Sequence, residues 1–112
     1  MSSDLKQKIQ EEVRTNTIVV YGKGTKQAPR CGFTMETVAF FNDLGYPYEV
    51  IDVLADTDKR QALSEITNWP TLPKVFINGQ FYGDTDILGP MRESGELKTV
   101  LDAAFAEPSK HL

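Results

Sequence analysis

The chain of 112 residues has only one cysteine and one histidine. A single cysteine cannot form a disulfide within its own chain, which excludes a disulfide-stabilised scaffold and favours a reducing, cytosol-like compartment. A cysteine hydrolase needs a base that takes up the thiol proton, and a zinc site built by one chain needs about four ligands. The cysteine, Cys31, and the histidine, His111 in the tail, supply neither arrangement.

Positive charge and long apolar stretches are scarce as well. The chain has 12 Lys and Arg against 16 Asp and Glu, a net charge of -4, and an acidic surface does not attract nucleic acid or anionic membranes. No apolar run approaches the roughly 20 residues that span a bilayer, and the N-terminal sequence has no apolar signal-peptide core. We therefore expect no nucleic-acid or membrane partner and a cytoplasmic location.

The chain does contain enough apolar sequence to fold. Hydrophobic residues make up 40% and charged residues 25%, which is typical of a globular domain, and the length fits one domain. We expect a single domain over 1–112, with a core over about 4–105 and a polar tail over 106–112.

Hydrophobic periodicity predicts the order helix, strand, helix, strand, helix, hairpin, helix. The first helix is expected to be capped by Ser3 or Asp4, the second to start near Gly32, the third to be capped by Asp56 or Thr57, and the last to run from about Pro90 to Phe105. The strands are expected to cover 17–21, 48–53, 74–78 and the residues after Asn78-Gly79. The strand–helix–strand spacing predicts a parallel pair, and Asn-Gly predicts a tight hairpin. Leu63 and Ile66 are expected to face inward from the third helix. The predicted fold class is α/β, a four-stranded mixed sheet flanked by helices.

The stretch A-P-R-C-G-F-T places Cys31 between a glycine-containing loop and the second helix. Unpaired N–H groups in the first turn of a helix favour a thiolate, and so do the nearby Lys23 and Arg30. The thiolate is both the nucleophile and the metal-ligating form. The alternative is a buried structural cysteine, because free cysteines are commonly core residues.

Thr34 occupies the position of the second cysteine in a C-x-x-C pair. That cysteine normally resolves a mixed disulfide formed by the first. A hydroxyl does not attack a disulfide at neutral pH, so another molecule must resolve any mixed disulfide at Cys31. Gly32 allows a bound group to approach the backbone closely. The alternative for Thr34 is an ordinary residue of the first helical turn.

Two further stretches have features of a ligand site. In W-P-T-L-P, a cis bond before Pro73 would leave the main chain of Leu72 open to an extended peptide, and a trans proline at a sheet edge is the alternative. In G-D-T-D, N–H groups at a helix start would hold a carboxylate and an aspartate would hold an ammonium group. Simple N-capping is the alternative for Asp84 to Asp86.

These stretches, in this order, resemble the monothiol glutaredoxins of the thioredoxin-fold superfamily, the C-G-F-S type, over about residues 4 to 105. The matching segments are K-G-T (23–25), A-P-R-C-G-F-T (28–34), W-P-T-L-P (69–73), K-V-F-I-N-G-Q-F (74–81) and G-D-T-D-I (83–87). The resemblance implies a thioredoxin fold and a bound glutathione. It implies that Lys23 and Arg60 face the glycine carboxylate of the ligand, and that the main chain of Leu72, before a cis Pro73, pairs with its backbone. Thr85 and Asp86 are then expected to hold the γ-glutamyl end. Cys31 is expected to meet the sulfur, with Gly32, Phe33 and Thr34 beside it.

The resemblance also implies a 2Fe–2S cluster at a dimer interface. Such a cluster needs four protein or ligand sulfurs when no histidine takes part, and two Cys31 thiolates with two glutathione thiolates supply them. The protein is then a homodimer with the cluster and a monomer without it. Its expected roles are cluster storage and delivery to apo iron–sulfur client proteins and iron homeostasis, with a BolA-like protein as a further candidate partner.

Two other functions stay open at this point. The same thiol would serve a glutathione-dependent thiol–disulfide oxidoreductase that removes glutathione from protein mixed disulfides by a one-cysteine route. The chain would otherwise be an interaction module with an incidental thiol. For Phe33, core packing is the alternative to shielding the sulfur.

The sequence departs from the family pattern at several positions. Thr34 replaces the usual serine, and G-D-T-D replaces the usual G-G-C-D. Thr85 therefore cannot form a regulatory disulfide with Cys31, and the charge of Asp84 is expected to weaken glutathione binding. Gly22 replaces a bulkier residue and is expected to loosen the side of the site that holds Lys23.

Overall fold

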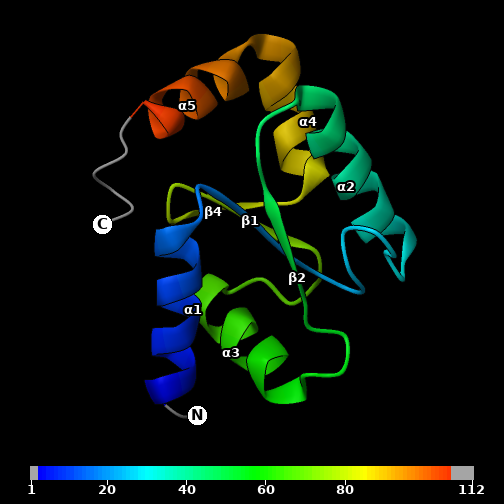
Figure 1. Ribbon diagram of the computed structural model, residues 1–112, viewed down its shortest axis with the longest axis vertical. Coiled ribbons are helices and arrows are strands. Elements are labelled where there is room, and N and C mark those ends of the chain that lie inside the picture. Colours follow the sequence, from blue (N-terminus) through cyan, green and yellow to red (C-terminus); the bar gives the residue numbers. More distant parts are fainter. Residues whose placement is uncertain (1–2, 107–112) are drawn as a thin grey trace.

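The computed structural model describes residues 3–106, which form a four-stranded sheet in the order β2-β1-β3-β4 with helices around it (Figure 1). The elements are α1 (Ser3–Thr15), β1 (Ile18–Gly22), α2 (Gly32–Leu44), β2 (Glu49–Asp52), α3 (Thr57–Thr67), β3 (Lys74–Ile77), β4 (Gln80–Gly83), α4 (Thr85–Ser94) and α5 (Glu96–Phe105). Strand β1 pairs parallel with β2 and antiparallel with β3, and β3 pairs antiparallel with β4. The predicted mixed sheet is confirmed. Apart from Ala106, the predicted tail with His111 lies outside the described residues.

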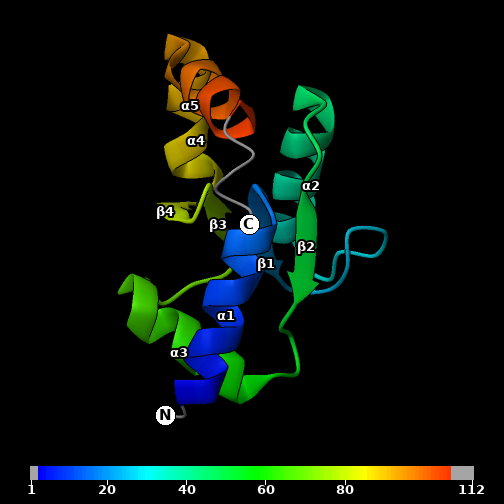
Figure 2. The same ribbon diagram turned by 60° about the vertical axis from the view of Figure 1, so that its left-hand side comes forward.

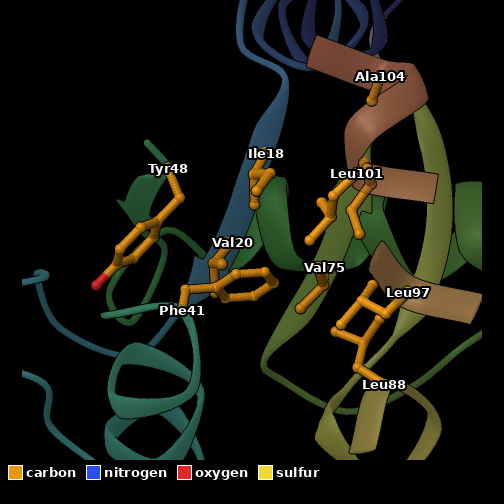
Figure 3. Close-up of a cluster of buried hydrophobic side chains, with 10 residues drawn as sticks. Ile18, Val20, Phe41, Tyr48, Val75, Leu88, Leu97, Leu101 and Ala104 are labelled. Carbon is orange, nitrogen blue, oxygen red and sulfur yellow. The ribbon is translucent and has the colours of Figure 1, made fainter. Parts of the chain in front are cut away.

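Strand β1 is buried on both faces, and its alternating side chains serve two separate cores. Ile18 and Val20 pack with Phe41 of α2 and with side chains of α4 and α5 (Figure 3). Val19 and Tyr21 pack on the other face against α1 and α3. Figures 1 and 2 accordingly show α1 and α3 on one side of the sheet and α2, α4 and α5 on the other. This sandwich fixes the end of β1 and the start of α2, between which the candidate thiol lies.

The predicted turn signals are confirmed. Gly45 ends α2 with a φ of 83°, and Asn78 and Gly79 have φ of 54° and 80°, as a type I′ hairpin requires. The side chain of Asp56 accepts the Lys59 N–H and so caps α3, which selects Asp56 over Thr57.

The C-terminal helix is not continuous, contrary to the prediction of one helix from Pro90 to Phe105. Helix α4 begins at Thr85, where the G-D-T-D stretch predicted a helix start, and contains Pro90. Gly95, with a φ of 86°, separates α4 from α5. A left-handed glycine is a common helix terminator. Gly95 therefore ends α4, although the apolar pattern of the sequence continues into α5.

Two smaller predictions are wrong. Ile66 shares the spacing of the buried Leu63 but is 43% exposed, because it lies in the last turn of α3, just before the chain turns at Asn68 with a φ of 52°. Ser3 and Asp4 were expected as caps, yet α1 already includes both residues. Among residues 3–106, no helix has the length and apolar character needed to cross a membrane.

Candidate functional site

Cys31 is the N-cap of α2, between the loop that follows β1 and the first turn of the helix. Its backbone is extended (φ −151°, ψ 159°), and its sulfur accepts the Thr34 N–H at 3.4 Å. The first turn of α2 contains no acidic residue, so nothing there opposes the partial positive charge of the helix start. The predicted position of the thiol is confirmed, and a fully buried structural cysteine is excluded because Cys31 is only partly buried.

The surroundings of Cys31 favour the thiolate. Partial burial by itself raises the pKa of the thiol, but hydrogen bonds from the side chain and main chain of Thr34 and from the Phe33 main chain lower it, as does the charge of Lys23. The net pKa lies below that of an ordinary cysteine. The pKa of Asp52 is lowered mainly by hydrogen bonds from the Leu54 and Gly24 N–H groups and, to a smaller extent, by the charge of Arg30. Arg30 was expected to act on the thiol instead.

Thr34 links the thiol to the end of β1. Its side chain is fully buried, and its hydroxyl oxygen lies 3.2 Å from Cys31 Sγ and accepts the Lys23 N–H at 3.1 Å. Thr34 is therefore more than an ordinary first-turn residue. The Lys23 main chain is thus tied to Thr34, and the expected loosening of the Lys23 side of the site stays a prediction.

A second tie holds the loop between β1 and α2, which extends to the side of the molecule in Figure 2. Asp52, at the end of β2, accepts the N–H groups of Gly24 and Leu54, both at 2.9 Å. The Arg30 N–H donates to the Lys23 carbonyl at 2.7 Å. Sequence reasoning missed Asp52, although its place at the end of a parallel strand next to β1 is a signal that was available.

The Leu72–Pro73 peptide bond is cis, as the resemblance implied, and the trans alternative is excluded. The β1–β3 ladder begins at the Tyr21–Lys74 pair, so the main chain of Leu72 lies beyond the sheet's hydrogen bonds. Leu72 and Arg60 line one cavity of about 350 Å³. The Arg60 guanidinium also donates to the Leu54 carbonyl at 3.2 Å.

Lys74 is a buried cation that sequence reasoning missed. Its side chain is 1% exposed, and its ammonium group donates to the carbonyls of Trp69 and Thr71, the latter at 2.6 Å. Burial lowers the pKa of Lys74 to about 8. Lys74 therefore holds the segment that precedes Leu72. The Lys74 side chain reaches these carbonyls because it folds back toward the residues that precede it in the chain. The strand pattern of the sequence does not indicate this direction.

The start of α4 carries the acidic residues of the site. Asp84 is the N-cap, and its carboxylate accepts the Asp86 N–H at 2.9 Å, so the simple capping alternative is realised. The Thr85 hydroxyl donates to Glu36 of α2 at 2.5 Å. Sequence reasoning missed Glu36, which lies far from Thr85 in the chain. One of the N–H groups at this helix start that were predicted to hold a ligand carboxylate, that of Asp86, is already bonded to Asp84.

Two contacts join parts of the candidate site. Thr85 and Glu36 join α4 to α2, and a Cβ added at Gly83 would lie 3.6 Å from the Trp69 ring, which brings the segment before Leu72 beside α4. Phe33 is 70% exposed, which excludes core packing for it. A Cβ added at Gly32 would meet nothing within 4 Å, so the start of α2 has open space beside the thiol.

Within residues 3–106, no group of three or more His, Cys, Asp or Glu is arranged to hold a metal ion. Cys31 is the free cysteine that the described residues offer to a metal at this place. A metal centre there would need ligands from other molecules.

Comparisons with known proteins agree with this arrangement. The family model of the glutaredoxins matches residues 18–82. An uncharacterized monothiol glutaredoxin of Synechocystis is 43% identical over 95% of this chain and 99% of its own length. The crystal structure of a buckwheat glutaredoxin in complex with glutathione superposes with a TM-score of 0.80 at 29% identity, covering 95% of this chain and 97% of its own. The solution structure of reduced apo GrxS14 from poplar has a TM-score of 0.80 at 35% identity, covering 91% and 94%.

Proposed function

The chain belongs to the glutaredoxin family, and from that premise we propose that it binds glutathione and carries a bridging 2Fe–2S cluster as a monothiol glutaredoxin. The observation that carries the proposal is the thiol itself. Cys31 caps a helix without acidic residues in its first turn, its pKa is lowered, and Thr34 supplies no second thiol. A thiolate with no internal partner is suited to sharing a ligand set with an outside thiol.

The glutathione site is proposed to run from the thiol to the start of α4. Lys23 and Arg60 would bind the glycine carboxylate, the main chain of Leu72 before Pro73 would pair with the peptide, and Cys31 would meet the sulfur. Thr85 and Asp86 would hold the γ-glutamyl end. The open main chain at Leu72 and the cavity shared by Arg60 and Leu72 support this path, as does the glutathione complex of the buckwheat glutaredoxin.

The cluster is cargo in this proposal, and the chain's own residues hold it in place. Four sulfur ligands are needed, and each of two chains would contribute Cys31 and one glutathione. The lowered pKa of Cys31 favours the thiolate, which is the form that binds iron. The open space at Gly32 and the exposed Phe33 leave room for a second chain beside the thiol. Two of the four ligands are then exchangeable small molecules, which suits delivery to another protein.

The wider setting of the proposal is cytoplasmic iron–sulfur cluster storage and transfer and iron homeostasis. The protein would be a monomer when apo and a homodimer with the cluster, with apo iron–sulfur proteins as clients and a BolA-like protein as a further partner. The acidic composition supports partners other than nucleic acid and membranes.

The test is anaerobic reconstitution with iron, sulfide and glutathione, followed by visible spectroscopy and measurement of the mass in solution. A coloured dimer that requires glutathione is expected, and Cys31→Ser should give a colourless monomer. A colourless wild-type monomer in the presence of all three components would contradict the proposal.

A second function is favoured by the same lowered pKa of Cys31, namely removal of glutathione from protein mixed disulfides. The Cys31 thiolate would attack the glutathione sulfur, the protein thiolate would leave and take up a proton, and Cys31 would carry glutathione. A second glutathione thiolate would then attack that glutathione sulfur, releasing oxidised glutathione and the Cys31 thiolate. Turnover of a glutathionylated peptide no faster than the uncatalysed reaction would exclude this function.

A further inference from the structure

Gly22, the last residue of β1, lies directly against the side chain of Thr34. A Cβ added at Gly22 would lie 2.8 Å from Thr34 Cγ2 and 3.1 Å from its hydroxyl oxygen, whereas carbon atoms in contact are normally about 3.5–4.0 Å apart. Gly22 is not among the glycines with positive φ, so its backbone does not require glycine. Glycine is needed at position 22 because the Thr34 methyl group fills the space that a side chain would occupy.

The methyl group in turn determines where the Thr34 hydroxyl points. With Cγ2 against Gly22, the hydroxyl faces both the Lys23 N–H and Cys31 Sγ. The Lys23 amide only donates, so the single hydroxyl proton is free for the sulfur of a thiolate. Thr37, also buried in α2, instead donates its hydroxyl to the Phe33 carbonyl at 2.9 Å. The orientation of Thr34 is therefore not a general property of threonine in this helix.

We propose that Gly22 and Thr34 form a size-matched pair that holds the Thr34 hydroxyl against the Cys31 sulfur, which makes Gly22 a positioning residue for the thiolate. A serine at position 34 would keep the hydroxyl but lose the methyl group that holds it, so the hydroxyl could rotate among staggered positions. The two departures from the family pattern, glycine for a bulkier residue and threonine for serine, are then one compensating change.

The pair has a consequence for reactivity. A hydrogen bond to the charged form of a group lowers the pKa of an acid, and the Thr34 hydroxyl oxygen lies 3.2 Å from Cys31 Sγ. Gly22 would act on the thiol without touching it. This inference rests on the proposed role of Cys31 as the reactive thiol, but it can be tested on the apo protein with neither glutathione nor iron present.

The test is a cycle of variants at the two positions, with the apparent pKa of Cys31 read from the pH dependence of alkylation by iodoacetamide and the melting temperature read in parallel. Gly22→Ala should raise that apparent pKa by about one pH unit and lower the melting temperature, because the new methyl group displaces Thr34. Thr34→Ser alone should have a smaller effect. The double variant Gly22→Ala with Thr34→Ser should recover most of both losses, since the remaining 3.1 Å contact with the hydroxyl oxygen needs only a small shift.

Thr34→Val separates positioning from packing. It keeps the branched shape and removes the hydroxyl, so it should raise the apparent pKa of Cys31 by about one pH unit. Adding Gly22→Ala to Thr34→Val should then leave the pKa where it is, because no hydroxyl remains to be displaced. A purely structural role for Gly22 would change the melting temperature without this dependence of the pKa on residue 34.

Three results would overturn the proposal. One is a double variant Gly22→Ala with Thr34→Ser that is as impaired as Gly22→Ala alone. Another is an increase in pKa from Gly22→Ala that is as large in the Thr34→Val background as in wild type. If Gly22→Ala does not fold, its combination with Thr34→Ser must fold, and failure of both would show that the Thr34 methyl group is not what position 22 accommodates.

Discussion

The starts of α2 and α4, the two ends of the proposed glutathione site, differ in charge. Helix α2 is capped by the sulfur of Cys31, and its first turn has no acidic residue. Helix α4 is capped by Asp84 and has Asp86 in its first turn, with Glu36 against Thr85. One helix start thus keeps its positive field for a thiolate, and the other is neutralised by its own side chains. The difference indicates that a glutathione ligand would be held mainly from the thiol end.

The largest effect is therefore expected at the thiol end, from Lys23→Ala. Lys23 helps to lower the pKa of Cys31 and is the proposed partner of the glycine carboxylate, so its loss should weaken glutathione binding about ten-fold. Isothermal titration calorimetry on the reduced protein measures this. Lys26→Ala is the matched control, because Lys26 lies in the same loop but donates to the Tyr48 carbonyl at 2.5 Å. Equal losses for both lysines would contradict the proposed contact.

A second effect concerns Lys74, whose ammonium group holds the carbonyls of Trp69 and Thr71 in the segment before Leu72. Its pKa of about 8 lies below the ordinary value of 10.5, so between these values the unfolded chain binds the proton and the folded chain does not. Stability therefore rises with pH across that window. Relative to Lys74→Met, the wild type should gain on the order of 1–3 kcal/mol of unfolding free energy from pH 8 to 10.5.

Urea unfolding at a series of pH values measures this gain, since tyrosine ionisation is common to both chains and cancels in the difference. Lys8→Met is the control, because Lys8 is exposed on α1 and its replacement removes the same side chain without removing a buried ammonium group. Parallel curves for wild type and Lys74→Met would rule out a titrating lysine at this place.

The smallest effect is expected at the acidic end, and there binding should improve. Asp84→Asn removes a charge but keeps an oxygen that can accept the Asp86 N–H, and should tighten glutathione binding about two-fold. Asp84→Gly also frees that N–H for a ligand carboxylate and should tighten binding about five-fold. Glu96→Gln, in the first turn of α5, is the control for a general loss of negative charge. Weaker binding by Asp84→Gly would show that the helix cap matters more than the competing carboxylate.

The parts of this arrangement that sequence reasoning predicted are those that local chemistry determines. The hairpin at Asn78-Gly79, the end of α2 at Gly45 and the thiol at a helix start all follow from residues next to one another in the chain. The break at Gly95 was missed because the apolar pattern of the last helix continues across it. From sequence, a glycine can be identified as a helix end only when the apolar periodicity stops at the same place.

The missed residues of the site make contacts between distant parts of the chain. Glu36 meets Thr85, and Asp52 meets Gly24, and no periodicity relates such positions. Lys74 was assigned to a strand, correctly, but the strand pattern says nothing about a long side chain that folds back onto carbonyls. The compensation between Gly22 and Thr34 was likewise invisible, since both positions were recognised as unusual without any sign that they touch.

The sulfur of Cys31 is also a structural acceptor, because it completes the hydrogen bonding of the first turn of α2 through the Thr34 N–H. Replacing or losing a capping acceptor destabilises a helix start. When that sulfur bonds to another atom, its electron density is shared and the Thr34 amide loses part of its acceptor. If the proposed ligation of Cys31 takes place, it should therefore loosen the first turn of α2, and the exchange rate of the Thr34 backbone amide should report the chemical state of the thiol.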